Sequence, residues 1–197
     1  MSSIDTDIQA AAPADFPMPA FKLSRPDGEH TSVIFASPHS GAFYPDSLMG
    51  NLRVPLIDLR RIEDAYIDRL FENAPDFGAS LLTANYARSY VDLNRDAREI
   101  DPDMFEHDTP GPVGAISPRV QAGLGCFPKI GARGEPIYAK KLSLADGHHR
   151  LTHVHTPYHQ ALSDEIAALH QEFGSVMLID CLSMPSTQPG RSTMPDF

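Results

Sequence analysis

Ser32-Val33-Ile34-Phe35-Ala36, followed at once by Ser37-Pro38-His39-Ser40-Gly41, is the stretch that decides the fold. The first run is mostly apolar and rich in β-branched side chains, which predicts a buried strand. The second places a histidine among proline, serine and glycine, which predicts a tight loop. Because open α/β sheets keep their ligands at the carboxyl ends of strands, we expect His39 to contact a substrate or a metal. A solitary surface-loop histidine is the alternative interpretation.

The next segment, residues 59–71, predicts a helix. An apolar stripe at helical spacing is formed there by Leu59, Ile62, Tyr66 and Leu70. The acidic pair Glu63-Asp64 lies off this stripe. Carboxylates in such a position usually form a solvated face, yet Glu63 or Asp64 could supply the oxygen ligand that zinc binds beside histidine. Helix phase leaves both residues open.

Two further strands are predicted at residues 79–83 and 89–93, and the second runs into Asn94-Arg95. A guanidinium next to an amide at a strand end suits bidentate binding of a substrate carboxylate. The alternative is that Arg95 simply pairs with Asp92 or Asp96.

Several segments, in this order and spacing, resemble the N-formylglutamate amidohydrolase family. The resemblance extends from about Val33 to the last residue. The matching segments are residues 37–41, Tyr44-Pro45, 60–66, 90–95, 134–138, Lys141-Leu142, Pro157-Tyr158-His159 and 179–184.

The resemblance implies an α/β fold related to the zinc carboxypeptidases and acylases, with a phosphorylase/hydrolase-like architecture. Its central sheet would be mixed, mostly parallel and flanked by helices. The implied reaction is zinc-dependent cleavage of the N-acyl amide of an acidic amino acid, which converts N-formyl-L-glutamate to formate and glutamate within histidine degradation.

The resemblance also implies roles for individual residues. His39 and Glu63 would bind zinc. The residues themselves keep Asp64 open as the alternative to Glu63, and Asp180 as a candidate oxygen ligand. Asn94 and Arg95 would hold the α-carboxylate of the substrate. A second cation would meet the side-chain carboxylate, and the candidates are Arg60, Arg61, Lys129 and Arg133.

One ligand of the family pattern is replaced in this chain. The family has a histidine where Leu182 stands, and leucine offers no donor atom, so zinc binding is expected to be weak or absent. Asp180 would share a strand face with Leu182 and could replace the ligand, whereas Cys181 would point away. Family members continue past Phe197 through a segment that holds the catalytic glutamate. We therefore expect a C-terminally truncated domain whose general base is absent from the chain.

The segment 151–173 predicts a second helix, which is rich in histidine. His155 and His159 are four residues apart, as are His149 and His153, and such pairs can chelate metals. No glutamate lies between them in a zinc-protease pattern, so a solvated face or adventitious metal binding is favoured over catalysis. Pro157 should kink the helix or mark a late start.

Composition predicts one soluble domain, residues 20–197, preceded by a flexible arm at residues 1–19 that has no signal-peptide pattern. The net charge of −10 argues against nucleic acid, and no apolar run could span a membrane. Two cysteines in unlike contexts favour a reducing cytoplasm over secretion. Residues 101–136, dense in glycine and proline, predict an irregular excursion. The sequence does not indicate an oligomeric state.

Three hypotheses follow. The chain is an amidohydrolase of this type with a metal site altered at Leu182. Alternatively, it is a non-catalytic relative that binds an acidic metabolite or a protein partner through Asn94-Arg95. The third hypothesis is that Leu182 and the end at Phe197 reflect an altered or incomplete chain.

Overall fold

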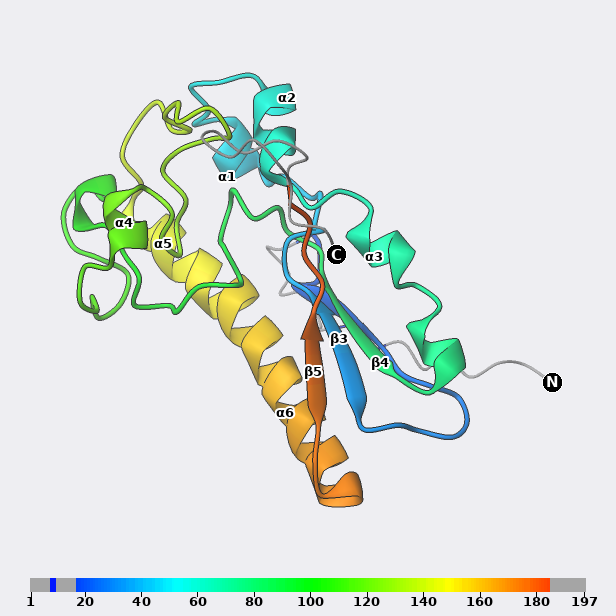
Figure 1. Ribbon diagram of the computed structural model, residues 1–197. Helices are drawn as coiled ribbons and strands as arrows, with labels where there is room; N and C mark the ends of the chain where they lie inside the picture. Colours follow the sequence, from blue (N-terminus) through cyan, green and yellow to red (C-terminus); the bar gives the residue numbers. More distant parts are fainter. Residues whose placement is uncertain (1–7, 10–16, 185–197) are drawn as a thin grey trace.

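The computed structural model describes residues 8–9 and 17–184. A mixed sheet runs through its centre in the strand order β1-β2-β4-β3-β5 (Figure 1). The strands are β1 (Ile8–Gln9), β2 (Phe21–Ser24), β3 (Val33–Ser37), β4 (Ser80–Ala84) and β5 (Met177–Asp180).

Most helices of the described part are short, and one is long. The α-helices are α1 (Asp46–Met49), α2 (Leu56–Leu59), α3 (Ile67–Leu70), α4 (Pro118–Gln121), α5 (Leu144–Arg150) and α6 (Thr156–Phe173). The 3-10 turns are η1 (Arg60–Ile62), η2 (Ala74–Phe77) and η3 (Pro102–Met104). A π-helical turn, η4 (Leu151–His155), joins α5 to α6.

The predicted mixed α/β sheet is confirmed, and β3 lies where its position in the sequence suggested. It pairs in parallel with β4 on one side and with β5 on the other, whereas β2 pairs antiparallel with β4. The runs predicted at 32–36 and 79–83 are β3 and β4. Because β3 ends at Ser37, the loop that holds His39 starts at the carboxyl end of a central strand.

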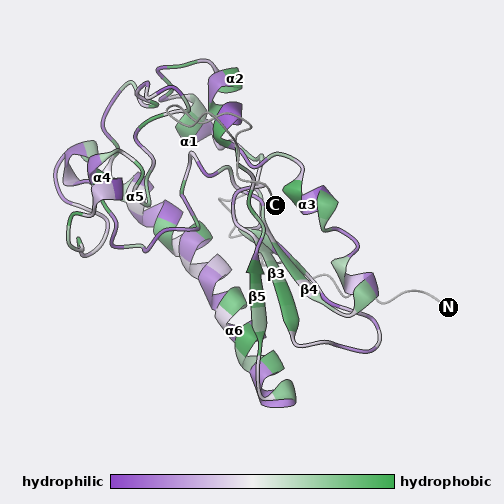
Figure 2. Cartoon of the chain, in the orientation of Figure 1, coloured by the Kyte–Doolittle hydropathy of each residue, from purple (hydrophilic) through white to green (hydrophobic). Residues whose placement is uncertain are grey.

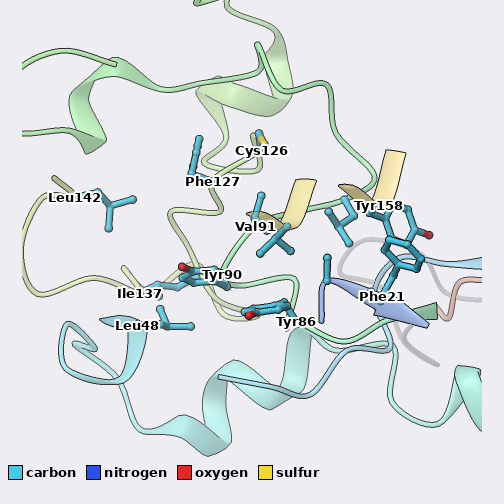
Figure 3. Close-up of a cluster of buried hydrophobic side chains, with 14 of the residues drawn as sticks. Phe21, Leu48, Tyr86, Tyr90, Val91, Cys126, Phe127, Ile137, Leu142 and Tyr158 are labelled. Carbon is cyan, nitrogen blue, oxygen red and sulfur yellow. The ribbon is translucent and has the colours of Figure 1, made fainter. Parts of the chain in front are cut away.

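The two faces of the sheet pack unequally. A large apolar cluster joins Phe21 of β2 and Leu82 of β4 to Val154 of η4, to Tyr158 of α6 and to the loops around them. Figure 3 draws Phe21 and Tyr158 among the side chains of this cluster. The other face holds a small cluster centred on Leu81 and the nearby turn η2. Hydropathy colouring shows the strands as the apolar centre of the molecule (Figure 2). Burial of the larger cluster therefore provides most of the hydrophobic stabilisation.

A buried carboxylate attaches α6 to the sheet. Glu165 of α6 is 3% exposed and accepts hydrogen bonds from Arg25 Nε and Nη2, at 2.8 and 2.6 Å. Ser80 Oγ in β4 donates to its other oxygen at 2.6 Å. Since both oxygens have partners, the charge is compensated and the helix is fixed in register against β4.

The predicted helix at 59–71 is wrong. The chain forms α2 and η1, becomes extended at Glu63 (ψ 145°) and adopts a left-handed conformation at Tyr66 (φ 67°) before α3. A tertiary hydrogen bond from Asp64 N–H to the His39 carbonyl, at 3.1 Å, replaces the helical one. Leu59 is buried and Ile62 packs against the core, but Tyr66 and Leu70 are 62% and 74% exposed, so only the first half of the expected apolar stripe packs.

The strand predicted at 89–93 is also wrong, because this segment forms turns. Tyr90, Val91 and Leu93 are all buried, whereas a half-buried strand would alternate. The segment belongs to the large apolar cluster although it lies outside the sheet, so its sequence has the same apolar run as a central strand. The irregular excursion predicted at 101–136 is confirmed, with only η3 and α4 inside it.

The histidine-rich helix is longer than predicted and starts at Leu144. Pro157 lies in the first turn of α6, directly after the π-helical turn, so the helix passes the proline without a break in the chain of helical turns. Beyond α6, β5 ends at Asp180, and Leu182 follows it in irregular structure. Cys181 is buried, which agrees with the expectation that it points away from Asp180.

Most of the predicted N-terminal arm lies outside the described residues. Of its residues, Ile8–Gln9 form β1, and the carbonyl of Met18 accepts a hydrogen bond from Tyr86 Oη at 2.8 Å. In the described part of the chain, helices fall short of the length and apolarity that crossing a lipid bilayer requires.

Gly41 offers a test of the close approach between the β3 and β4 loops. A Cβ at this position would lie 2.2 Å from the Tyr86 carbonyl oxygen, so we expect Gly41→Ala to cost about 1–3 kcal/mol of unfolding free energy or more. Gly28→Ala is the matched control, because a Cβ there meets nothing within 4 Å. Urea unfolding followed by circular dichroism measures both variants. Equal midpoints would contradict the close approach.

Candidate functional site

His39 lies at the centre of the site, between two carboxylates from different loops. Its side chain is 4% exposed. Its Nε2 lies 2.7 Å from Asp92 Oδ1, and its Nδ1 lies 3.3 Å from Asp64 Oδ2. His39 Nδ1 is buried and makes no hydrogen bond in the described structure. The imidazole is therefore held on one side and offers a buried nitrogen to Asp64 on the other.

Asp92 is the most fully bonded carboxylate in the site. Besides the His39 ring, it accepts the backbone N–H of Asn94 at 2.9 Å and Arg88 Nη2 at 2.9 Å. Burial alone would raise the pKa of Asp92. The hydrogen bond from His39 and the positive charges of His39, Arg88 and Arg95 outweigh burial and hold that pKa far below its usual range. Asp92 is thus a permanent anion that orients the histidine.

The pKa of His39 is raised from its ordinary value. Burial opposes the charged ring and would lower the pKa, but the carboxylates of Asp64 and Asp92 more than compensate. The same contacts act on Asp64: burial would raise its pKa, while His39 and Ser183 lower it. The pair favours a cation between the two carboxylates.

The structure separates the two acidic neighbours. Asp64 is buried, faces His39 and accepts a hydrogen bond from Ser183 Oγ at 2.9 Å. The Glu63 side chain turns to Tyr44, whose hydroxyl donates to it, and to Arg60, whose Nε lies 3.5 Å away. The extended backbone at Glu63 produces this divergence. Asp64 is therefore the carboxylate that faces His39 Nδ1, the nitrogen without a hydrogen bond.

Asp180 lies near the same centre but makes a different contact. It is exposed, and its Oδ2 accepts a hydrogen bond from Asn94 Nδ2 at 3.2 Å. Its pKa is raised by burial and by the charges of Asp64 and Asp92. Leu182 is 43% exposed. Across residues 8–9 and 17–184, no three His, Cys, Asp or Glu side chains cluster in a way that could hold a metal ion.

A pocket of about 590 Å³ opens beside Asp64 and Asp92. Two cations, Arg61 and Arg88, line it, together with apolar residues from the irregular excursion such as Leu124 and Ile130. Arg88 is a site residue that the sequence did not reveal. Its i, i+4 spacing to Asp92 is a signal that could have identified the pair.

The other predicted cations lie away from this pocket's lining. Arg60 is half exposed and contacts Glu63, and Arg133 is exposed on the excursion, where its N–H bonds Glu135 Oε2 at 2.8 Å. Lys129 pairs with Asp101 at 2.7 Å. These three are not brought to His39.

Asn94 and Arg95 line a neighbouring pocket, together with Leu93, Asp96, Ala97, His155 and His159. Arg95 Nε donates to the Leu124 carbonyl at 3.0 Å, and its Nη1 donates to the Asn94 carbonyl at 2.6 Å. The alternative prediction paired Arg95 with Asp92 or Asp96, but Asp96 pairs with Arg98 and Asp92 with Arg88. Carbonyl partners leave the Arg95 charge available to an anion.

The donor set at His39 is chemically suited to a metal such as zinc. A buried imidazole nitrogen without a partner faces a carboxylate, and nitrogen and oxygen are zinc ligands. The opposite ring nitrogen is held by Asp92, which is the usual arrangement around a metal-binding histidine. The described residues thus offer two zinc ligands, His39 and Asp64, because Leu182 has no donor atom.

Comparison with known proteins matches this chain to one family. Residues 31–197 match the family described as N-formylglutamate amidohydrolase. N-formylglutamate deformylase of Pseudomonas aeruginosa is 32% identical over 162 residues, which are 75% of this chain and 54% of that protein. The Pseudomonas putida protein of the same name is 29% identical over 171 residues, 84% of this chain and 57% of its own length. The chain thus spans about half the length of these curated relatives.

Solved structures show the same likeness. An N-formylglutamate amidohydrolase from Ralstonia eutropha JMP134 superposes with a TM-score of 0.78 at 35% identity, over 84% of this chain and 58% of that one. A gene product of Agrobacterium tumefaciens superposes with a TM-score of 0.57 at 20% identity, over 87% of this chain and 59% of that one. This second structure shows a similar fold and no more.

The role of Asp92 can be tested through the pKa of His39. Asp92→Asn removes one of the carboxylates that raise this pKa, so we expect it to fall, as followed by NMR titration of the ring. Because the pKa of His39 is higher in the folded than in the unfolded chain, protonation of His39 stabilises the fold, and this stabilisation is complete below the unfolded pKa of about 6.5. It is lost as the pH rises through the folded pKa. The free energy of unfolding of Asp92→Asn should therefore fall less over this pH interval than that of wild type. Asp96→Asn, whose carboxylate binds Arg98, is the control. An unchanged His39 pKa in Asp92→Asn would contradict the assignment.

Proposed function

The chain belongs to the N-formylglutamate amidohydrolase family, and from this membership we propose that it binds N-formyl-L-glutamate and hydrolyses its amide to formate and glutamate. The observation that most supports the proposal is the buried His39, oriented by Asp92 and faced by Asp64 at the carboxyl end of β3. Water adds to the formyl carbon, the C–N bond breaks, and the amine nitrogen takes up a proton.

His39 Nδ1 and the Asp64 carboxylate would hold the metal, which we propose to be zinc. Zinc supplies a Lewis acid that activates water and polarises a carbonyl. Asp92 keeps the His39 ring in the tautomer and orientation that leave Nδ1 free to bind. Ser183 steadies Asp64 by a hydrogen bond to the oxygen that faces away from His39. We favour Asp64 over Glu63 because Glu63 is bonded to Tyr44.

Two pockets would bind the two carboxylates of the substrate. Asn94 and Arg95 line one, and a guanidinium beside an amide suits a bidentate carboxylate. Arg61 and Arg88 line the other, next to Asp64. We propose these two in preference to Arg60 and Arg133, which lie outside that pocket's lining. The acidic chain would thus present local positive charge where the substrate binds.

The position of Leu182 makes the strength of metal binding the central question. Two protein ligands bind zinc much more weakly than three, and Asp180 is the residue we propose to complete the set. Its carboxylate lies close enough to His39 and Asp64 to interact electrostatically with both. We assign no general base among the described residues.

A second candidate function is non-catalytic binding of an acidic metabolite through the Asn94-Arg95 pocket. The observation that favours it is the Arg95 guanidinium, which lines that pocket and donates to the carbonyl groups of Leu124 and Asn94, so that its charge remains for an anion. Participation in histidine degradation and a cytoplasmic location are further proposals that rest on family membership. We expect a small-molecule substrate rather than nucleic acid, and we propose no oligomeric state.

The first test is glutamate release from N-formyl-L-glutamate with added zinc and with a chelator. We expect Leu182→His to raise zinc affinity and turnover together, because it restores a nitrogen ligand. Leu178→His is the matched control, since that leucine is exposed to a similar degree, 46% against 43%, but lies inside β5. Release that resists the chelator would overturn the metal assignment. No release by wild type or by Leu182→His would favour the binding function.

The carboxylate pocket has a test of its own. Arg95→Ala removes a charged donor, so glutamate binding measured by calorimetry should weaken by about 1.5–3 kcal/mol. Arg98→Ala is the control, because the Arg98 guanidinium is exposed and donates to Asp96, away from Arg95. Equal affinity of Arg95→Ala and wild type would remove Arg95 from the pocket.

A further inference from the structure

The segment that holds Asn94 and Arg95 is not part of the sheet, so its carbonyl groups need partners from elsewhere. Three of these partners are side chains that reach the segment from outside it. Tyr138 Oη donates to the Ser89 carbonyl at 2.9 Å, and Arg150 Nη1 donates to the Tyr90 carbonyl at 2.8 Å. His155 Nε2 lies 2.8 Å from the Arg95 carbonyl. Side chains therefore replace the ladder that a strand would have.

Two of these side chains come from the long helix around the π-helical turn η4. Arg150, fully buried, precedes the turn, and His155, 7% exposed, ends it. π-Helical turns are rare and occur frequently at functional sites. Here the turn brings Arg150 and His155, five residues apart, onto the same loop.

The chemistry of the His155 contact is defined by its partner. A carbonyl oxygen only accepts hydrogen bonds, so Nε2 must carry the proton. Burial lowers the pKa of His155, and the bond to Arg95 offsets this only in part, so the ring is neutral near pH 7. The neutral ring with its proton on Nε2 is a fixed donor.

His159 packs its ring against His155. Its ring centroid lies 4.3 Å from that of His155, one helical turn away. Burial and the neighbouring His155 lower its pKa, while the backbone of Leu93 raises it. His155 thus contacts the backbone at Arg95, and the His159 ring packs beside it, with a buried Nε2 that makes no hydrogen bond in the described structure.

We infer that His155, with the His159 ring packed against it, is a positioning residue that fixes the backbone at Arg95, so that the Asn94 amide and the Arg95 guanidinium are aimed at one carboxylate of the ligand. The inference rests on the proposed function, because it names what holds that carboxylate pocket in shape. Binding groups must be held within about 0.5 Å of their productive geometry, and a loop without ladder bonds reaches this only through such supports.

The first experiment measures binding of L-glutamate, the proposed product, to the full chain by calorimetry. His155→Phe keeps a ring beside His159 but removes the donor, and we expect about 5- to 10-fold weaker binding. His155→Gln retains an N–H donor and should restore most of the affinity. His170→Phe is the matched control, because His170 lies on the exposed last turn of α6.

Hydrogen exchange separates positioning from general stability. In His155→Phe, exchange should quicken at Leu93–Asp96, while the amides of β3 and the urea midpoint stay as in wild type. The Gln variant should protect the segment as wild type does.

Each result has one meaning. Equal affinity of His155→Phe and wild type overturns the inference and leaves the proposed function intact. Equal losses in both His155 variants, together with faster exchange in β3, show a purely structural role and also overturn it. No glutamate binding by wild type overturns the proposed function, and this inference with it. Weaker glutamate binding by His155→Phe, with affinity restored in His155→Gln, supports the positioning role.

Discussion

The buried carboxylate of Asp92 is the constraint on which the arrangement of the site depends. Its oxygens are shared by the His39 ring, the Asn94 backbone and the Arg88 guanidinium, which come from the β3 loop and from the loop after β4. An uncompensated charge at this depth would be strongly unfavourable, so these partners must assemble together. The same carboxylate that orients the candidate metal-binding histidine also shapes the turn leading to the candidate carboxylate-binding arginine.

The fold could be predicted where a segment's pattern has a single physical cause. β3 and β4 are short apolar runs at the sheet centre, and they form where the sequence places them. Residues 59–71 have a helical period, yet Asp64 N–H bonds the His39 carbonyl, and that distant contact breaks the helix. Residues 89–93 are all buried although they lie outside the sheet, and this gives them the same pattern as a central strand.

The site shows the same limit at the level of single residues. His39, Asn94 and Arg95 could be singled out because their local sequence, a tight loop and a guanidinium beside an amide, already suggests chemistry. Glu63 and Asp64 could not be separated, since one extended residue decides which of them faces His39. The i, i+4 spacing of Arg88 and Asp92 is a local signal for that pair, but the contact of Asp92 with His39 depends on how two loops meet, which no local pattern contains.

The π-helical turn has a consequence for how the long helix tolerates change. Each residue of an α-helix rotates the side-chain direction by about 100°, so a one-residue deletion within Leu151–His155 would alter the rotational phase between everything before and after it. Arg150 could then keep its loop contact, or Glu165 its pairing with Arg25 and Ser80, but not both. The π-helical turn therefore sets the rotation between two parts of the helix, so that Arg150 faces the loop while Glu165 faces the sheet.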